Sequence, residues 1–220
     1  MTVLVLAAHP DDELLGPGGT IARHVHEGEE VHAVVLAEGA TSRYEDGMAG
    51  VLAESSKRAA EVLGLTSLTL GTLPDQRLDA LPLIEVTQQI EAIVDQLQPT
   101  VVYSHFPGDV NTDHGVVARA AWTACRPYVL PKLTRFAVFE TPSSTEWAWP
   151  LEGSVFKPNL FVDIESTLDQ KLQAMACYSS ELRDYPHPRS LRAIKERAAF
   201  WGSCMGRKAI EAFQVLREVK

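Results

Sequence analysis

Four side chains that can bind a cation or move a proton follow one another near the start of the chain. Residues 8–13, AHPDDE, supply one imidazole and three carboxylates, and they directly follow a short apolar run at residues 3–7. Such runs of valine and leucine are typical of a buried parallel strand. In an open α/β sheet, ligands bind beyond the carboxyl ends of the strands. Because clustered carboxylates repel one another, we expect a bound cation here.

A second polar cluster, DVNTDH at residues 109–114, follows an apolar run at residues 100–104. A doubly wound sheet places its first and fourth strands side by side, so the two clusters should meet at one edge. His9, Asp12 and His114 then form a three-ligand set with an open position, as in catalytic zinc sites. In the alternative reading, the two aspartates cap the following helix and His114 lies on the surface.

The elements that must position these side chains alternate between strand and helix in the first half of the chain. Strands are expected at residues 3–8, 31–37, 67–70 and 100–104, and helices at 20–27, 51–63, 83–97 and 113–125. This rhythm predicts an α/β, Rossmann-like, doubly wound and mainly parallel sheet with helices on both faces. Right-handed crossovers place all four strand ends on the same edge.

The second half of the chain is less regular. Strands are expected at residues 133–140 and 160–164, helices at 167–178, 190–202 and 208–218, and a long loop at 141–157. We expect residues 141–150 of this loop, with Glu140, Trp147 and Trp149, to shape the rim of a pocket or a subunit contact. Because no linker-like composition separates the halves, we expect one domain over residues 1–220.

Composition excludes several classes of function. The formal net charge of −9 argues against nucleic acid as a partner, because phosphate binding requires a basic face. The three cysteines are widely spaced and form no CxxC pair, which indicates neither a thiolate metal site nor a disulfide framework. The first apolar run is too short for a signal peptide or a membrane span, so we expect a cytoplasmic protein.

Both polar clusters resemble the motifs of the PIG-L/LmbE-like zinc N-deacetylases, which remove acetyl groups from N-acetylglucosamine-type sugars and their conjugates. The resemblance extends over nearly the whole chain, to HPRS at residues 187–190 and EAF at residues 211–213. It implies that His9, Asp12 and His114 bind Zn²⁺ and that Asp11 is the general base. A set of two histidines and one aspartate also suits another divalent metal, such as iron or cobalt.

The resemblance also implies a substrate and an assembly. Arg58 resembles a family arginine associated with substrate hydroxyls, and Asp75 resembles an aspartate that contacts the sugar. The alternatives are an exposed helix residue for Arg58 and a turn former for Asp75. The implied partner is a small-molecule N-acetylated sugar or glycoconjugate, and the implied assembly is a homo-oligomer.

The chain departs from the family pattern at Asn111, where many members have the first histidine of a His-x-x-His motif. An amide donates a hydrogen bond but cannot act as an acid. Either Asp11 performs both proton transfers, or another histidine contributes. His187 is our candidate for this catalytic role, with Asn111 as a second hydrogen-bond donor to the substrate. For His105 we favour a packed, hydrogen-bonded role.

Three other functions stay open at this point. The same metal chemistry would also serve an amidase that cleaves a thiol conjugate or a secondary-metabolite sugar. GPGG at residues 16–19 superficially suggests a nucleotide-binding loop, although it lacks the G-x-G-x-x-G order and follows acidic residues. The third possible function is that of a non-catalytic metal-binding protein. The presence of Asp11 beside an open ligand set argues against this function.

Overall fold

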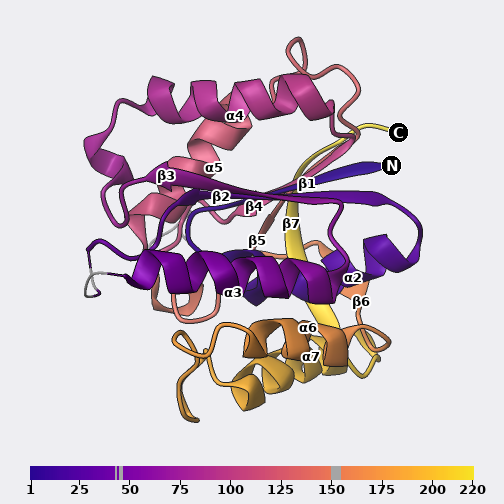
Figure 1. The fold of residues 1–220 in the computed structure, drawn as a ribbon. Coiled ribbons are helices and arrows are strands. Elements are labelled where there is room, and N and C mark those ends of the chain that lie inside the picture. Colours follow the sequence, from indigo (N-terminus) through magenta and orange to yellow (C-terminus); the bar gives the residue numbers. More distant parts are fainter. Residues whose placement is uncertain (43, 45–46, 150–154) are drawn as a thin grey trace.

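One continuous sheet connects both halves of the chain in this computed structural model, which describes residues 1–42, 44, 47–149 and 155–220. The strand order is β3-β2-β1-β4-β5-β7-β6 (Figure 1). The strands are β1 Thr2–Ala7, β2 Glu30–Ala37, β3 Ser67–Leu73, β4 Val101–His105, β5 Arg135–Phe139, β6 Leu160–Asp163 and β7 Ile210–Glu218.

Strands β1 to β5 are parallel, and β1 pairs with both β2 and β4. The chain order of the strands therefore reverses at β1, which confirms the predicted mainly parallel, doubly wound sheet. It also confirms that the two strands before the polar clusters are neighbours. Strand β7 is antiparallel to both β5 and β6.

Helices cover both faces of the sheet. They are α1 Asp12–Leu15, α2 Gly18–His26, α3 Met48–Leu63, α4 Leu83–Leu97, α5 Thr112–Ala124, α6 Leu168–Ala176 and α7 Leu191–Met205, with 3₁₀ turns η1 Leu78–Ala80 and η2 Thr145–Trp147. Helices α4 and α5 lie on one face, and α2, α3, α6 and α7 lie on the other (Figure 1). Among the described residues, no helix has the length and apolar composition needed to cross a membrane.

Side chains of β1 alternate between these two layers. Val3 and Val5 pack in the core cluster that contains Leu52 of α3, whereas Leu4 and Leu6 pack in the cluster that contains Val86 of α4. Because β1 is buried on both faces, its sequence is a continuous apolar run rather than an alternation of polar and apolar residues.

The helix predicted at residues 208–218 is wrong, because this segment forms strand β7. Its glutamate, alanine, glutamine and leucine residues favour a helix locally. Pairing with β5 on one side and β6 on the other outweighs that preference, and residues 210–213 are buried. The predicted loop at 141–157 contains the turn η2, and its residues 150–154 lie outside the described ones.

The glycines of GPGG serve close packing. A Cβ on Gly16 would lie 2.3 Å from the ring of Phe139, and a Cβ on Gly19 would lie 2.8 Å from Ile164. The backbone of this segment therefore approaches β5 and the end of β6 more closely than any side chain would permit.

A carboxylate from the other end of the chain occupies the N-terminus of α2. Glu211 of β7 accepts the backbone N–H groups of Gly19 and Thr20 at 2.8 and 2.7 Å. The ammonium of Lys171 donates to Glu211 at 2.6 Å and also reaches two backbone carbonyls. Since this carboxylate fills the position that a nucleotide phosphate would take, the arrangement argues against nucleotide binding at this helix.

Glu211→Ala should destabilise the fold strongly, because it leaves the Lys171 ammonium buried without a counter-charge. The expected loss in the free energy of unfolding is about 3–5 kcal/mol, measured by urea denaturation. Glu165→Ala is the matched control, since Glu165 pairs with Lys208 at the surface and its loss should leave the denaturation midpoint nearly unchanged. Similar midpoints for the two variants would contradict the role of Glu211.

Candidate active site at the edge of the sheet

The first motif begins with a sharp backbone turn after β1. Asp11 has a left-handed backbone with φ of 95°, a conformation that residues other than glycine seldom adopt. Its N–H donates to Oε2 of Glu13 at 3.0 Å, and the other oxygen of Glu13 accepts the hydroxyl of Tyr178. Burial raises the pKa of Glu13 to about 7. The Glu13 side chain thus holds the backbone of Asp11 in its unusual conformation.

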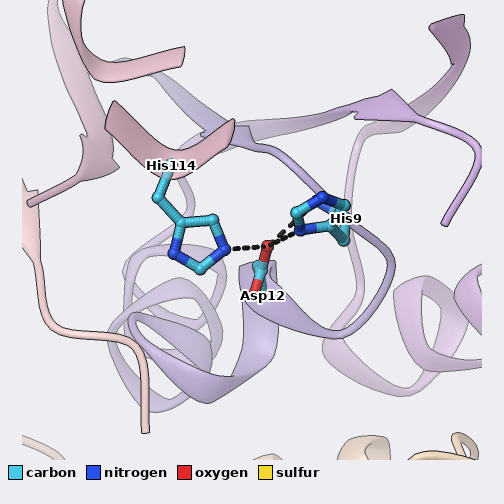
Figure 2. A group of neighbouring side chains, drawn as sticks. All are labelled: His9, Asp12 and His114. Atoms are coloured by element: carbon cyan, nitrogen blue, oxygen red, sulfur yellow. Dashed lines mark hydrogen bonds and ion pairs between the residues drawn. The ribbon is translucent and has the colours of Figure 1, made fainter. Parts of the chain in front are cut away.

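One oxygen of Asp12 is the centre of the site. Oδ2 lies 3.3 Å from Nδ1 of His9, 3.2 Å from Nε2 of His114 and 3.5 Å from Nε2 of His105. Figure 2 shows the carboxylate between the imidazoles of His9 and His114. Burial opposes ionisation of Asp12, but the charge of His114 and the hydrogen bonds from His114 and His9 hold its pKa well below the usual range.

A buried carboxylate near η1 orients His9. Nε2 of His9 lies 2.9 Å from Oδ2 of Asp113, whose other oxygen accepts the backbone N–H of Leu78 at 3.0 Å. Burial disfavours a charged imidazole, but Asp113 and Asp12 together raise the pKa of His9 to about 10. The ring therefore presents Nδ1 to Asp12 and Nε2 to Asp113.

His114 lies in the first turn of α5. Asn111 caps this helix, because its Oδ1 accepts the backbone N–H of Asp113 at 3.0 Å. Nδ1 of His114 lies 3.2 Å from Asp109, but within the described part of the chain neither buried ring nitrogen has a well-aligned hydrogen bond. Burial opposes protonation, yet Asp12 and Asp109 raise the pKa of His114 to about 9.

These residues fit a divalent cation. His9, Asp12 and His114 each offer a ligand atom, and the three atoms lie within 4.8 Å of one another. The nitrogens of His114, which have no well-aligned hydrogen bond among the described residues, are available as ligands, and the buried carboxylates favour added positive charge in the cluster. Asp113 and Asp109 lie against the far nitrogens of the two histidines, as carboxylates behind metal-bound imidazoles do.

His105 supports the site without facing the cavity. Its Nε2 accepts the backbone N–H of Ala8 at 2.9 Å, and its Nδ1 lies 3.1 Å from the hydroxyl of Thr141. The ring stacks on His114 with centroids 3.9 Å apart. Burial and the neighbouring His114 lower the pKa of His105 to about 3, so this imidazole is neutral.

A cavity of about 510 Å³ opens beside the cluster. The residues expected from the sequence that line it are His9, Asp11, Asp12, Asp75, Asn111, His114 and His187. Arg58 is not among its lining residues and is exposed on α3, whereas Leu52 of the same helix does line the cavity. The structure thus brings together every expected site residue except Arg58.

The side chain of Asp11 contacts a different partner from the one that the side chain of Asp12 contacts. Its Oδ2 lies 3.4 Å from Nη1 of Arg189, which also donates to Glu181 at 2.9 Å. The hydroxyl of Tyr44 donates to the other oxygen of Glu181 at 2.7 Å. Burial and the carboxylate of Asp12 raise the pKa of Asp11 well above its usual value, against the opposing effect of Arg189.

His187 is held by its own turn. Nδ1 accepts the backbone N–H of Arg189 at 3.1 Å, which assigns the proton of the neutral ring to Nε2. Partial burial and the charge of Arg189 lower the pKa of His187, so the neutral form dominates at pH 7. The ring is therefore a hydrogen-bond donor at the cavity wall.

Sequence reasoning did not assign Asp109, Asp113, Arg189, Glu181 or Tyr44. Asp109 and Asp113 lie inside the second polar cluster, and Arg189 follows His187 by two residues. Their closeness in sequence to predicted site residues could have identified them. Glu181 and Tyr44 had no such signal, because they meet across 137 residues of sequence.

Several known proteins resemble this chain in sequence. Residues 4–125 match the PIG-L family model, described as GlcNAc-PI de-N-acetylase. The diacetylchitobiose deacetylase of Thermococcus kodakarensis is 25% identical over 224 residues, covering 96% of this chain and 82% of that protein. A probable N-acetyl-α-D-glucosaminyl L-malate deacetylase 2 of Bacillus anthracis is 24% identical over 188 residues, covering 81% and 80%.

A solved structure agrees over almost the full length. The conserved protein TT1542 from Thermus thermophilus superposes with a TM-score of 0.80 at 25% identity, covering 99% of this chain and 96% of that one. The family match extends over more than half of the chain and includes both polar clusters. This chain therefore belongs to the PIG-L family of de-N-acetylases and is a hydrolase of the deacetylase class.

Proposed function

We propose that this chain is a zinc-dependent N-deacetylase that acts, as one domain, on an N-acetylglucosamine-type sugar or sugar conjugate. Its products are acetate and an amino sugar. The observation that carries the proposal is the position of Asp11 at the same cavity as His9, Asp12 and His114. Relatives named as deacetylases of diacetylchitobiose and of a glucosaminyl malate support the substrate class.

His9, Asp12 and His114 would hold the cation, and Zn²⁺ suits two imidazoles and one carboxylate. When bound, this ion supplies Lewis-acid polarisation of the acetyl carbonyl and lowers the pKa of water towards roughly 7. Asp113 and Asp109 keep the two imidazoles in place from behind.

Asp11 is the general base in this scheme. Its carboxylate accepts a proton from water as the water oxygen attacks the acetyl carbon. The protonated carboxyl then gives that proton to the nitrogen as the C–N bond breaks, so one residue performs both transfers. Arg189 and the backbone turn hold Asp11 apart from Asp12, which leaves its carboxylate free of the ligand set.

Two donors at the cavity wall stabilise the oxyanion. Because Oδ1 of Asn111 caps α5, the Nδ2 group is the end that donates to substrate. Nε2–H of His187 is the second donor. Asp75 accepts a sugar hydroxyl, whereas Arg58 is exposed on α3 outside the lining residues of the cavity and is given no role in this scheme.

Acetate release tests the activity and the base together. The zinc-loaded protein should release acetate from N-acetylglucosamine or N,N′-diacetylchitobiose, and Asp11→Asn should lower kcat by about 10²–10⁴-fold without loss of zinc. Asp79→Asn, the same change at an exposed position, is the control. A normal kcat in Asp11→Asn would refute the base assignment. Turnover of thiol-conjugate amides with no turnover of sugars would favour the amidase alternative.

Zinc affinity tests the ligand set. His114→Ala should lose stoichiometric zinc, and Asp113→Asn should weaken zinc binding by about 10–100-fold through its effect on the ring of His9. Chelator competition gives the affinities, and His26→Ala at an exposed position is the control. Full zinc occupancy in His114→Ala would exclude this residue as a ligand.

The two oxyanion donors can be separated by kinetics. His187→Ala should lower kcat by about 10²–10³-fold with little change in KM, because its hydrogen bond forms in the transition state. Asn111→Ser keeps a helix cap while shortening the donor, so its kcat should also fall with the fold intact. An unchanged kcat in His187→Ala would leave Asn111 as the donor and remove His187 from the mechanism.

A further inference from the structure

A large aromatic side chain stands at the mouth of the cavity and has no part in the mechanism above. Trp147 lines the cavity, yet 55% of its surface is exposed to solvent. Apolar side chains of this size favour burial. An exposed tryptophan at a cavity rim offers apolar surface for contact with a bound molecule.

The segment that carries Trp147, which we call the Trp147 loop and which comprises residues 141–148, is built as a fixed unit. The carboxylate of Glu146 accepts the backbone N–H groups of Ser143 and Ser144 at 2.9 and 3.1 Å. The hydroxyl of Thr145 accepts the backbone N–H of Thr141 at 2.8 Å, and Trp147 donates its own N–H to Ser144 at 3.1 Å. These bonds fix the position of the tryptophan before any ligand binds.

The Trp147 loop is also joined to the candidate metal centre. The hydroxyls of Ser144 and Thr145 both donate to Asp109, the latter at 2.8 Å, and Asp109 is the carboxylate beside His114. Thr141 of the same loop lies against His105. The indole is therefore held in a constant relation to the residues that would act on the acetyl group.

His187 supports the indole from the side. Its ring meets Trp147 edge to face, with centroids 6.2 Å apart and planes at 84°. More than half of the Trp147 surface stays exposed beside this contact, so the indole keeps area for a ligand. The oxyanion donor and the aromatic surface thus stand next to each other on the cavity rim.

The chemistry around this surface suits a sugar ring. A pyranose presents C–H groups on one face and hydroxyl groups around its edge. The indole of Trp147 matches the C–H face, and the neighbouring polar side chains of Ser143 and Ser144 can bind the hydroxyls. The volume of about 510 Å³ lies within the range of roughly 300–1,000 Å³ that encloses drug-sized ligands, which exceed one monosaccharide.

We propose that Trp147 forms a second sugar subsite, which binds a pyranose ring linked to the ring that loses its acetyl group. The inference rests on the proposed deacetylation and specifies its substrate further: a disaccharide or glycoside is bound in preference to a single N-acetylated sugar. Trp147 contributes to binding and leaves the chemical step to the residues beside the cation.

The test compares one sugar with two. Trp147→Ala should lower kcat/KM for acetate release from N,N′-diacetylchitobiose by about tenfold, because KM rises. The same variant should change kcat/KM for N-acetylglucosamine by less than about twofold. Trp147→Phe should retain most of the preference. Trp149→Ala is the matched control, since Trp149 is 72% exposed but does not line the cavity, and it should behave as the unmodified protein.

An equal loss for both sugars, or no loss for either, would overturn the subsite. If the unmodified protein releases acetate from neither sugar, the proposed activity on these sugars fails, and calorimetric titration of the Asp11→Asn variant decides the subsite separately. The subsite is supported if the disaccharide binds more tightly than N-acetylglucosamine and if Trp147→Ala removes this difference in affinity. Equal affinities, or no binding of either sugar, would refute it.

Discussion

The site depends on one buried carboxylate oxygen at which three imidazoles converge. Oδ2 of Asp12 lies within 3.5 Å of nitrogens from His9, His105 and His114. A desolvated charge is costly unless it is paired, so His9 and His114, whose pKa values are raised, must both meet Asp12 for the fold to be stable. Since His9 and Asp12 follow β1 while the other two histidines stand at and beyond the end of β4, the pairing of β1 with β4 is a condition for the site.

The same motif gives two adjacent aspartates different environments. Asp12 faces imidazoles, whereas Asp11 faces Arg189 from a segment 178 residues away. The left-handed backbone of Asp11 makes this divergence possible, at a cost on the order of 1–3 kcal/mol. Glu13 and Tyr178 offset that cost with hydrogen bonds, so the second half of the chain stabilises the conformation of the first motif.

The pairing of β1 with β4 and the cluster of His9, Asp12 and His114 could be predicted because both follow from local patterns and general topology. Apolar runs identify the strands, and the rules of doubly wound sheets place β1 beside β4. Strand β7 could not be predicted, since its residues favour a helix and only its neighbours in the sheet override that preference. The environment of Asp11 could not be predicted from the sequence either, because Tyr44, Glu181 and Arg189 come together only in the folded chain.

The cap on α2 has a consequence for biosynthesis. The backbone N–H groups of Gly19 and Thr20 leave the ribosome long before Glu211, which is 192 and 191 residues further along. Until β7 is made, the nascent chain carries an uncapped helix beside the first motif and an unpaired edge on β5. Contacts of such sequence separation form slowly, and exposed strand edges promote aggregation. The fold around the site therefore closes only after β7 has been synthesised, although the first motif is among the first residues to be made.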